Sequence, residues 1–382
     1  MKTNEESRDE AIHASKRKLI SKTYLRNTWY VAMWSEELVR GELVTRTILN
    51  EPLVFFRTED GSVAALSERC AHRSAPLSMG KVLPGDRVQC PYHGLEFGAE
   101  GKCVHNPHGD GKIVATNRVR SFPVAEKHRL VWVWTGDRQP DASAIPDFSV
   151  LDTDDEFAIT KRDRIMVHAN YELVTDNLLD LSHTSYLHDG ILGNLEMVDA
   201  EMSIKHEGDT IVVGRASKNS SIPGMFKSLL PGFERVDKWN TIRWTAPSNL
   251  LLRSGVVEPG GAPESGTGYY GIHLLTPETD SSTHYHFAAV RWNILTRGDE
   301  VNLEIREKLG VTRRFAFADQ DAPVIEAQQR RIEGANERVD PVLLSIDAGP
   351  VRYKRILQRL IQEESAPLRE AIRPSEMPQV AK

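Results

Sequence analysis

The chain contains two pairs of metal-binding side chains, each made of one cysteine and one histidine. They are Cys70-Ala-His72 and, after seventeen intervening residues, Cys90-Pro-Tyr-His93. Two thiolates can hold one iron of a [2Fe–2S] cluster while two imidazoles hold the other, and neutral imidazoles raise the reduction potential of the cluster. The two motifs therefore predict a one-electron relay that accepts electrons from a donor of lower potential.

The same four side chains could instead form a Cys2His2 zinc site, because zinc takes the same ligand types. The usual zinc fingers pair Cys with Cys and His with His along the sequence, whereas each loop here carries one of each. Ligand order and spacing favour the iron–sulfur cluster. A plain electron carrier and a zinc-stabilised interaction protein are the alternatives to an enzyme.

A second group of chemically capable side chains has the pattern Asn177-x2-Asp180-x2-His183-x4-His188. Two histidines and one carboxylate on one face of an iron leave open positions for oxygen and an adjacent substrate. On an ideal helix the two histidines would point about 140° apart. A π-bulge, or a helix that ends between them, is therefore needed to direct both imidazoles at one metal.

Asp180 and Asn177 precede His183 by about one and two helical turns. The Asp180 carboxylate is expected to accept a hydrogen bond from the outer N–H of a ligand, or from a cluster histidine on another chain. Such partners orient metal ligands and tune the metal. Asn177 could approach the iron weakly or pack beside the site.

The third ligand of this metal must come from another segment. The predicted helix around residues 316–326 offers Asp319, Asp321 and Glu326. Pro323 distorts the backbone just beyond Asp321, which can turn that side chain inward. The residue types alone do not separate Asp319 from Asp321. Four other histidines are available, and the last two share a face of a predicted strand: His168, His273, His284 and His286.

The segments that position these residues fall into two parts. Residues 24–138 are predicted to form a small all-β domain, because short apolar runs such as 53–56 and 63–66 flank an Asp-Gly turn. A turn-rich linker at 139–146 follows. A polar tail, 1–23, precedes this domain.

Residues 147–366 are predicted to form a second, α+β domain, followed by a tail at 367–382. Helical character runs from 170 to 188, and a long charged helix is expected from 301 to 333. Pro323 costs a helix interior about 3 kcal/mol, so that this helix should kink or break there. The remaining elements are strand-like stretches at 210–215, 241–257, 266–275 and 283–295 and a last helix at 351–364.

The composition of the chain limits the kinds of binding partner that it is expected to have. The net charge is -6, so neither a nucleic acid nor an anionic membrane is implied. No stretch approaches the roughly 18 apolar residues that cross a bilayer. Two of the three cysteines are assigned to the cluster and Cys103 is expected to be a buried thiol. The chain is therefore predicted to work in the reducing cytoplasm.

The chain resembles the Rieske non-haem iron oxygenases, in particular the oxygenase components of dicamba and vanillate O-demethylases and related N-dealkylases. The resemblance covers nearly the whole chain after the tail. It rests on Cys-Ala-His-Arg at 70–73, Cys-Pro-Tyr-His-Gly-Leu-Glu-Phe at 90–97, Cys-Val-His-Asn-Pro-His at 103–108, Asp-Asn-Leu-Leu-Asp-Leu-Ser-His at 176–183, His188, and Gln-Asp-Ala-Pro-Val-Ile-Glu-Ala at 320–327.

The resemblance implies an α+β fold, with an N-terminal all-β Rieske domain followed by a catalytic domain whose antiparallel sheet is packed with helices in a helix-grip-like manner. It also implies two cofactors, a [2Fe–2S] Rieske cluster and a mononuclear Fe(II). The cluster ligands would be Cys70, His72, Cys90 and His93. The iron ligands would be His183, His188 and Asp321, with Asp180 as the acid that bridges to His93 of a neighbouring chain in a homotrimer.

The implied function is the terminal oxygenase of a multicomponent monooxygenase. Electrons from NAD(P)H would arrive through a separate reductase, a ferredoxin, or both, because this chain has no dinucleotide-binding glycine pattern. With O2 it would hydroxylate an alkyl carbon next to oxygen or nitrogen in a small aromatic substrate. Oxidative O-demethylation or N-dealkylation would follow. Dihydroxylation of an aromatic ring, or another hydroxylation, is the alternative on the same site.

Overall fold

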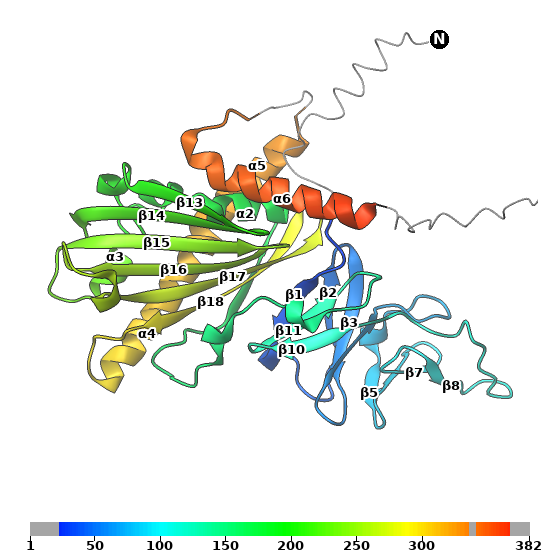
Figure 1. The fold of residues 1–382 in the computed structure, drawn as a ribbon. Helices are drawn as coiled ribbons and strands as arrows, with labels where there is room; N and C mark the ends of the chain where they lie inside the picture. The colour runs from blue at the N-terminus through cyan, green and yellow to red at the C-terminus, as the bar shows by residue number, and fades with distance from the viewer. Residues whose placement is uncertain (1–22, 336–340, 367–382) are drawn as a thin grey trace, which may run out of the picture.

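The computed structural model describes residues 23–335 and 341–366. The tails predicted at 1–23 and 367–382 lie outside these residues, apart from Thr23. Figure 1 shows two parts, a group of short strands at lower right and a large sheet at left that is crossed by helices. The architecture is the predicted α+β arrangement, with the all-β part first.

The N-terminal part consists of three small antiparallel sheets. The predicted hairpin is confirmed, because β3 pairs with β4 around the Asp60-Gly61 turn. β11, near the end of the domain, pairs with β1 at its start. The strands of the three sheets are β1 (Trp29–Trp34), β11 (Leu130–Trp134) and β10 (Val124–Lys127); β2 (Val44–Ile48), β3 (Glu51–Arg57), β4 (Val63–Ser67) and β9 (Ser121–Phe122); and β5 (Lys81–Leu83), β6 (Arg87–Gln89), β7 (Glu96–Gly98) and β8 (Cys103–His105).

A seven-stranded antiparallel sheet forms the second part. Side chains alternate between its two faces, so that Tyr269, Gly271 and His273 of β17 all point to the face covered by helices, against Arg313. The strands, in spatial order, are β12 (Asp163–Val167), β18 (Ser282–Trp292), β17 (Thr267–Thr279), β16 (Asn249–Val257), β15 (Arg235–Thr245), β14 (Thr210–Ser221) and β13 (Glu201–Glu207).

The helices that matter for the site pack on one face of this sheet. α4 (Asp299–Phe315) continues without a break through a π-helical segment (Ala316–Asp321) into α5 (Ala322–Glu333), and Figure 1 shows this rod crossing behind the sheet. α2 (Tyr171–Leu179) lies beside α5, and α6 (Ala348–Ser365) packs on β14 and α2. Among the buried side chains of the rod is a series spaced four residues apart: Ile305, Leu309, Arg313, Phe317, Asp321 and Ile325. A short further helix is α3 (Gly224–Lys227).

Three predictions about individual elements were wrong or incomplete. The helix predicted at 170–188 ends at Leu179, and His183 starts a short 3-10 turn, His183–Ser185. The stretch at 241–257, predicted as one strand, contains the end of β15 and all of β16. A turn with a cis Ala246–Pro247 bond joins these two strands. Strands β12 and β13 were not predicted from the sequence. The helix does not break at Pro323; its α-helical pattern is instead interrupted by the π-helical segment just before that residue.

The two parts pack directly on each other through main-chain and side-chain hydrogen bonds. The Leu49 N–H donates to the Pro277 carbonyl at 2.9 Å, and the Thr276 hydroxyl donates to the Val31 carbonyl at 2.7 Å. Both hydrogen bonds join the N-terminal part to β17. Among the described residues, no helix is long and apolar enough to cross a membrane.

Candidate metal centres

The two Cys/His loops of the N-terminal part have the same hydrogen-bonded shape. The Cys70 N–H donates to the Ala75 carbonyl and the Ser74 N–H donates back to the Cys70 carbonyl. In the second loop, Cys90 pairs in the same way with Leu95 and Gly94. Ser74 and Gly94 both have positive φ, 54° and 70°. Each loop therefore turns its cysteine and histidine toward the other loop.

The four side chains meet in the space between the loops. The Nδ1 atoms of His72 and His93 are 3.2 Å apart, and their ring centroids are 4.6 Å apart. Cys70 and Cys90 are buried and are not joined in a disulfide. Burial, together with the neighbouring Cys90, raises the pKa of Cys70 to about 11. A thiol in that position becomes a thiolate when a metal supplies the compensating charge.

This donor set fits a [2Fe–2S] cluster with two thiolates on one side and two imidazoles on the other. The imidazoles lie at the surface, where a cavity of about 590 Å³ opens. His108 lines the same cavity, and its Nε2 lies 2.8 Å from the His93 carbonyl oxygen. Cys103, the third cysteine, is a buried thiol as predicted, and burial raises its pKa.

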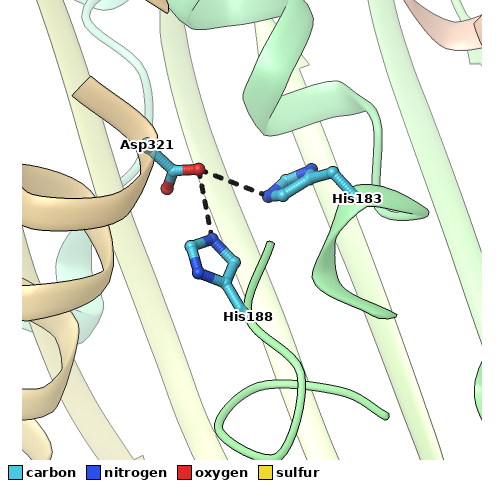
Figure 2. A group of neighbouring side chains, drawn as sticks. All are labelled: His183, His188 and Asp321. Atoms are coloured by element: carbon cyan, nitrogen blue, oxygen red, sulfur yellow. Dashed lines mark hydrogen bonds and ion pairs between the residues drawn. The ribbon is translucent and has the colours of Figure 1, made fainter. Parts of the chain in front are cut away.

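In the second part, His183, His188 and Asp321 converge in one place (Figure 2). One potential ligand atom from each lies within 4.8 Å of the other two. Asp321 Oδ1 is 3.1 Å from His188 Nε2 and 3.6 Å from His183 Nε2. Two imidazoles and one carboxylate directed at a common point match the 2-His-1-carboxylate pattern of non-haem iron sites.

Hydrogen bonds on the far side of each imidazole select the nitrogen that faces the metal position. His183 Nδ1 contacts the Asp180 carbonyl oxygen, and His188 Nδ1 lies 2.8 Å from Gln320 Oε1. Both acceptors require Nδ1–H, which leaves both Nε2 lone pairs free for a metal. Gln320 is itself held, because its Nε2 donates to the Leu187 carbonyl at 3.0 Å.

The π-helical segment and Asn177 place the Asp321 carboxylate. A π turn has more residues than an α turn, and Asp321, at its end, is buried while Asp319 is exposed. Asn177 Nδ2 donates to Asp321 Oδ1 at 3.0 Å. The structure thus separates Asp321 from Asp319, and gives Asn177 a contact with the carboxylate, one of the two roles considered for it.

Of the two hydrogen bonds considered for the Asp180 carboxylate, the one with a metal ligand of its own chain is not formed. The Asp180 main-chain oxygen, and not its carboxylate, meets His183. The carboxylate oxygen Oδ1 accepts from the Ser182 N–H at 2.9 Å and from the Ser182 hydroxyl, which fixes the turn after α2. The helix end that redirects the two imidazoles comes before both of them, not between them.

The two histidines have pKa values shifted in opposite directions. Burial lowers the pKa of His183, and Asp321 offsets only part of this effect. Burial also opposes protonation of His188, but the hydrogen bond with Asp321, the charge of Asp321 and the hydrogen bond with Gln320 together outweigh burial and raise the pKa of His188. A divalent ion at this position would replace the proton shared between His188 and Asp321.

The other histidines lie elsewhere. His284 and His286 share a strand face as predicted, but that face packs against the N-terminal part, where His284 Nε2 lies 3.0 Å from the Thr47 carbonyl oxygen and Trp34 lies beside His286. They do not line the iron site. The main-chain N–H of His168 donates to Glu326. His273 is buried on the helix-covered face of the sheet.

Gln320 is the functional residue that the sequence reasoning missed. Its position next to Asp321 was visible, yet nothing in the residue types shows that it reaches His188, 132 residues away. Only a polar side chain preceding a candidate ligand on a distorted helix would have drawn attention to it.

The fold and both centres define a class of protein, the Rieske-type non-haem iron oxygenases. Residues 28–123 match the Rieske [2Fe-2S] domain family, and residues 167–363 match the vanillate O-demethylase oxygenase C-terminal domain family. The chain belongs to this oxygenase family, and its cofactors are a Rieske [2Fe–2S] cluster and a mononuclear iron.

Relatives of known activity are similar over most of the chain. The oxygenase component of chloroacetanilide N-alkylformylase from Rhizorhabdus wittichii is 37% identical, over 90% of this chain and 97% of that protein. The oxygenase component of dicamba O-demethylase from Stenotrophomonas maltophilia is 40% identical, over 90% of this chain and 100% of that protein.

A crystal structure of dicamba monooxygenase bound to 3,6-dichlorosalicylic acid has a TM-score of 0.81 to this structure, with 38% identity over 90% of this chain and 99% of that chain. Another, containing non-haem iron and dicamba, has a TM-score of 0.75, with 37% identity over 91% of this chain and 100% of that chain.

Proposed function

We propose that this chain is the terminal oxygenase of a multicomponent monooxygenase that removes an alkyl group from the oxygen or nitrogen of a small aromatic compound. One oxygen atom of O2 enters the C–H bond next to the heteroatom, and two electrons and two protons reduce the other atom to water. The hemiacetal or hemiaminal then collapses to a phenol or amine and an aldehyde. The convergence of His183, His188 and Asp321 beside a separate cluster-binding domain is the observation that carries this proposal.

The proposed roles follow the contacts of each side chain. Cys70, His72, Cys90 and His93 would hold the cluster, and His183, His188 and Asp321 would hold Fe(II). The iron, when bound, supplies the oxygen-activating chemistry. The surrounding chain orients the three ligands and keeps water from the buried carboxylate. Asn177 keeps Asp321 in place through its hydrogen bond.

We further propose a homotrimer, in which Asp180 links the iron site of one chain to His93 of its neighbour. Figure 1 shows strands β5–β8, which flank the cluster loops, at the end of the molecule away from α2 and α5. Within one chain the two centres therefore lie in different parts of the fold. The His72 and His93 rings are at the surface, where a neighbouring chain has access.

The electron donor would be a ferredoxin, an NAD(P)H-dependent reductase, or both. The relatives described above are named as oxygenase components, which supports a donor on a separate chain. Arg73, Lys81 and Lys112 are exposed near the cluster loops and could meet an acidic donor, whereas Arg87 is paired with Glu96 at 2.6 Å. We place the protein in the cytoplasm, in keeping with its free cysteines. The proposed domains are 24–138 and 147–366.

The test is a turnover assay of the iron-loaded protein with NADH and a surrogate reductase and ferredoxin, on a panel of methoxy-aromatics and N-alkyl anilides. Release of formaldehyde or a higher aldehyde together with the phenol or amine is expected. The control is His183→Ala, which should keep the visible spectrum of the cluster and lose both mononuclear iron and turnover. A cis-diol product would show ring dihydroxylation instead, and full activity of His183→Ala would contradict the site.

A further inference from the structure

Arg215 of β14 is a buried arginine whose guanidinium donates to one loop. This loop joins α2 to β13 and carries both histidines of the metal site. Arg215 is 7% exposed. Its Nη1 donates to the Leu181 carbonyl at 2.7 Å, and its Nη2 donates to the carbonyls of Met197 at 2.5 Å and Val198 at 3.0 Å. One guanidinium therefore holds the beginning and the end of the histidine loop together.

The first of these carbonyls is next to the one that orients a metal ligand. His183 Nδ1 contacts the Asp180 carbonyl oxygen, and the following carbonyl, that of Leu181, accepts from Arg215. Ser185 lies between the two histidines in the sequence and is fully buried, and its hydroxyl oxygen is 3.5 Å from Arg215 Nη1. Because neighbouring peptide planes share a Cα atom, a rotation at Leu181 would also move the acceptor of His183.

Strand β14 gives this guanidinium a rigid base. The strand is paired on both sides, with Arg215 opposite Met202 of β13 and Asn240 of β15. Side chains two and four positions earlier point to the same face of the sheet, and these residues, Val213 and Ile211, are completely buried. The core of the sheet thus fixes the position from which Arg215 reaches the loop.

Other contacts hold the outer turn of the histidine loop. The Gly224 N–H donates to the Gly190 carbonyl at 2.9 Å, and the Met225 N–H donates to the Ile191 carbonyl at 3.1 Å. Both contacts lie beyond the second histidine and attach that turn to α3. Arg215 acts instead at the two ends of the loop, which the chain places 16 to 17 residues apart.

The charge of Arg215 strengthens these hydrogen bonds. Burial lowers the pKa of Arg215, and the nearby Asp180 and Tyr186 offset part of that effect. Arginine nevertheless stays protonated in proteins, and its planar fork of N–H groups can serve several acceptors at once. Hydrogen bonds from a charged donor are stronger than those between neutral groups.

We propose that Arg215 is a positioning residue that forms the histidine loop before the metal arrives. A loop without these bonds would be ordered only when the metal binds, and that loss of conformational entropy would lower metal affinity. The inference rests on the metal ligands proposed above, His183, His188 and Asp321. It is independent of the substrate and of the reaction.

Hydrogen exchange tests whether the loop is formed without metal. The sample is the full chain with its cluster, depleted of mononuclear iron by a chelator. Main-chain N–H groups of the loop have acceptors within it, such as that of Tyr186 with the His183 carbonyl at 2.9 Å. Wild-type peptides covering residues 181–198 should therefore be protected without metal. In Arg215→Met they should exchange about 10- to 100-fold faster.

Binding of Co²⁺ to the same iron-depleted protein gives a second readout. Competition with a chelator measures the affinity, and the EPR signal of Co²⁺ reports the ligand geometry while the oxidised cluster is EPR-silent. Arg215→Met should bind Co²⁺ about 10- to 100-fold more weakly and with a changed signal. Arg215→Lys keeps the charge but loses the fork, and its affinity should lie between those of wild type and Arg215→Met.

Arg291→Met is the matched control. Arg291 is also a buried arginine of the sheet, but it donates to the Asn302 carbonyl at 3.2 Å in the first turn of α4 and not to the histidine loop. Both variants should lower Tm, and only Arg215→Met should change loop exchange, Co²⁺ affinity and the EPR signal. Wild-type affinity in Arg215→Met, or an equal loss of affinity in Arg291→Met, would overturn the proposal.

The proposed function and the role of Arg215 can fail separately. Aldehyde release by wild type, together with unchanged Co²⁺ binding in Arg215→Met, would refute the positioning role and leave the function standing. Wild type that binds no metal besides its cluster would refute the function, and the exchange comparison would still decide the role of Arg215. A loop that is unprotected in metal-free wild type would overturn the proposal without any variant, so misfolding of Arg215→Met would not block the test.

Discussion

The iron-site histidines are oriented by the acceptors on their outer nitrogens. Gln320 and the Asp180 carbonyl accept from the two Nδ1–H groups, so that each Nε2 faces Asp321. Such outer hydrogen bonds commonly change metal affinity or activity by about 10- to 100-fold when removed. The acceptor for His183 is a main-chain atom and is insensitive to substitution, whereas Gln320 can be tested.

Gln320→Leu should weaken Fe(II) binding by about 10-fold or more, because it removes the acceptor that fixes the His188 ring. Iron content after competition with a chelator measures the effect. Gln320→Glu keeps an acceptor at the same place and is the control. The cluster spectrum should not change in either variant. Wild-type iron retention in Gln320→Leu would contradict the role given to this side chain.

Asp180→Asn tests the proposed electron link between chains. Asn retains an oxygen that can accept from Ser182, so the turn after α2 should persist and both metals should bind. Turnover should fall strongly, because the negative charge that would face His93 of a neighbour is gone. Steady-state rates and metal content together give the answer. A wild-type rate would show that Asp180 serves only the local turn.

Residue types and spacing were enough to predict most of the site. Ligands within about twenty residues of each other, such as Cys70 to His93, were visible in the sequence because their chemistry is recognisable. Asp321 needed the family resemblance, since Asp319 is chemically identical and only backbone geometry separates the two. Gln320 was not predicted, because a contact across the fold leaves no local pattern.

At the scale of elements, the sheet carries a buried lysine whose effect on stability can be measured. Lys238 of β15 is 5% exposed, and its Nζ lies 5.4 Å from the centre of the Phe226 ring. Burial, with the nearby charge of Arg215, lowers the pKa of Lys238 to about 7. The ordinary value in the unfolded chain is near 10.5, so the two states bind different numbers of protons between these pH values.

Between pH 7 and 10.5 the unfolded chain binds the extra proton, and Lys238 therefore makes the free energy of unfolding rise with pH, by at most about 1.4 kcal/mol per pH unit. Below pH 7 both states are protonated and the folded state bears the full cost. Lys238→Met should raise the free energy of unfolding at pH 7 and flatten this slope, as measured by urea unfolding at several pH values. The exposed Lys218, paired with Asp237, supplies Lys218→Met as the control. Equal slopes in wild type and Lys238→Met would contradict the prediction.

Elements with strong local signals were predicted well. Short apolar runs on either side of an Asp-Gly turn located β3 and β4, and the charged periodic stretch located α4 and α5. The helix predicted to 188 was wrong because periodicity continued past Leu179, where Ser182 and Asp180 instead form a turn. Local hydrogen bonds of Asp180 with Ser182 and His183, which apolar periodicity does not reveal, mark the end of that helix.

For the whole molecule, a mixing experiment tests whether electrons pass between chains. Cys90→Ala should lack the cluster, and His183→Ala should lack the mononuclear iron, so each alone should be inactive. Co-expressed and purified as mixed oligomers, they should recover part of the wild-type turnover, because an intact cluster of one chain would face an intact iron site of another. The control mixes the two separately purified variants at a concentration too low for chains to exchange between oligomers. Absence of any recovery in proven mixed oligomers would contradict transfer between chains.

The π-helical segment has a consequence for chain length. Its wider turn accommodates a residue that an uninterrupted α-helix would place elsewhere, so that Phe317 and Asp321 both point at the sheet. Because the wider turn absorbs one extra residue, deleting one residue between 316 and 320 would restore an α turn and leave α5 in phase with α4. The same deletion within α4 would instead rotate everything after it by about 100°, and the carboxylate would leave the metal position although no ligand had been replaced. This site therefore depends on a count of residues as well as on their identities, and a scan of substitutions alone would not reveal that dependence.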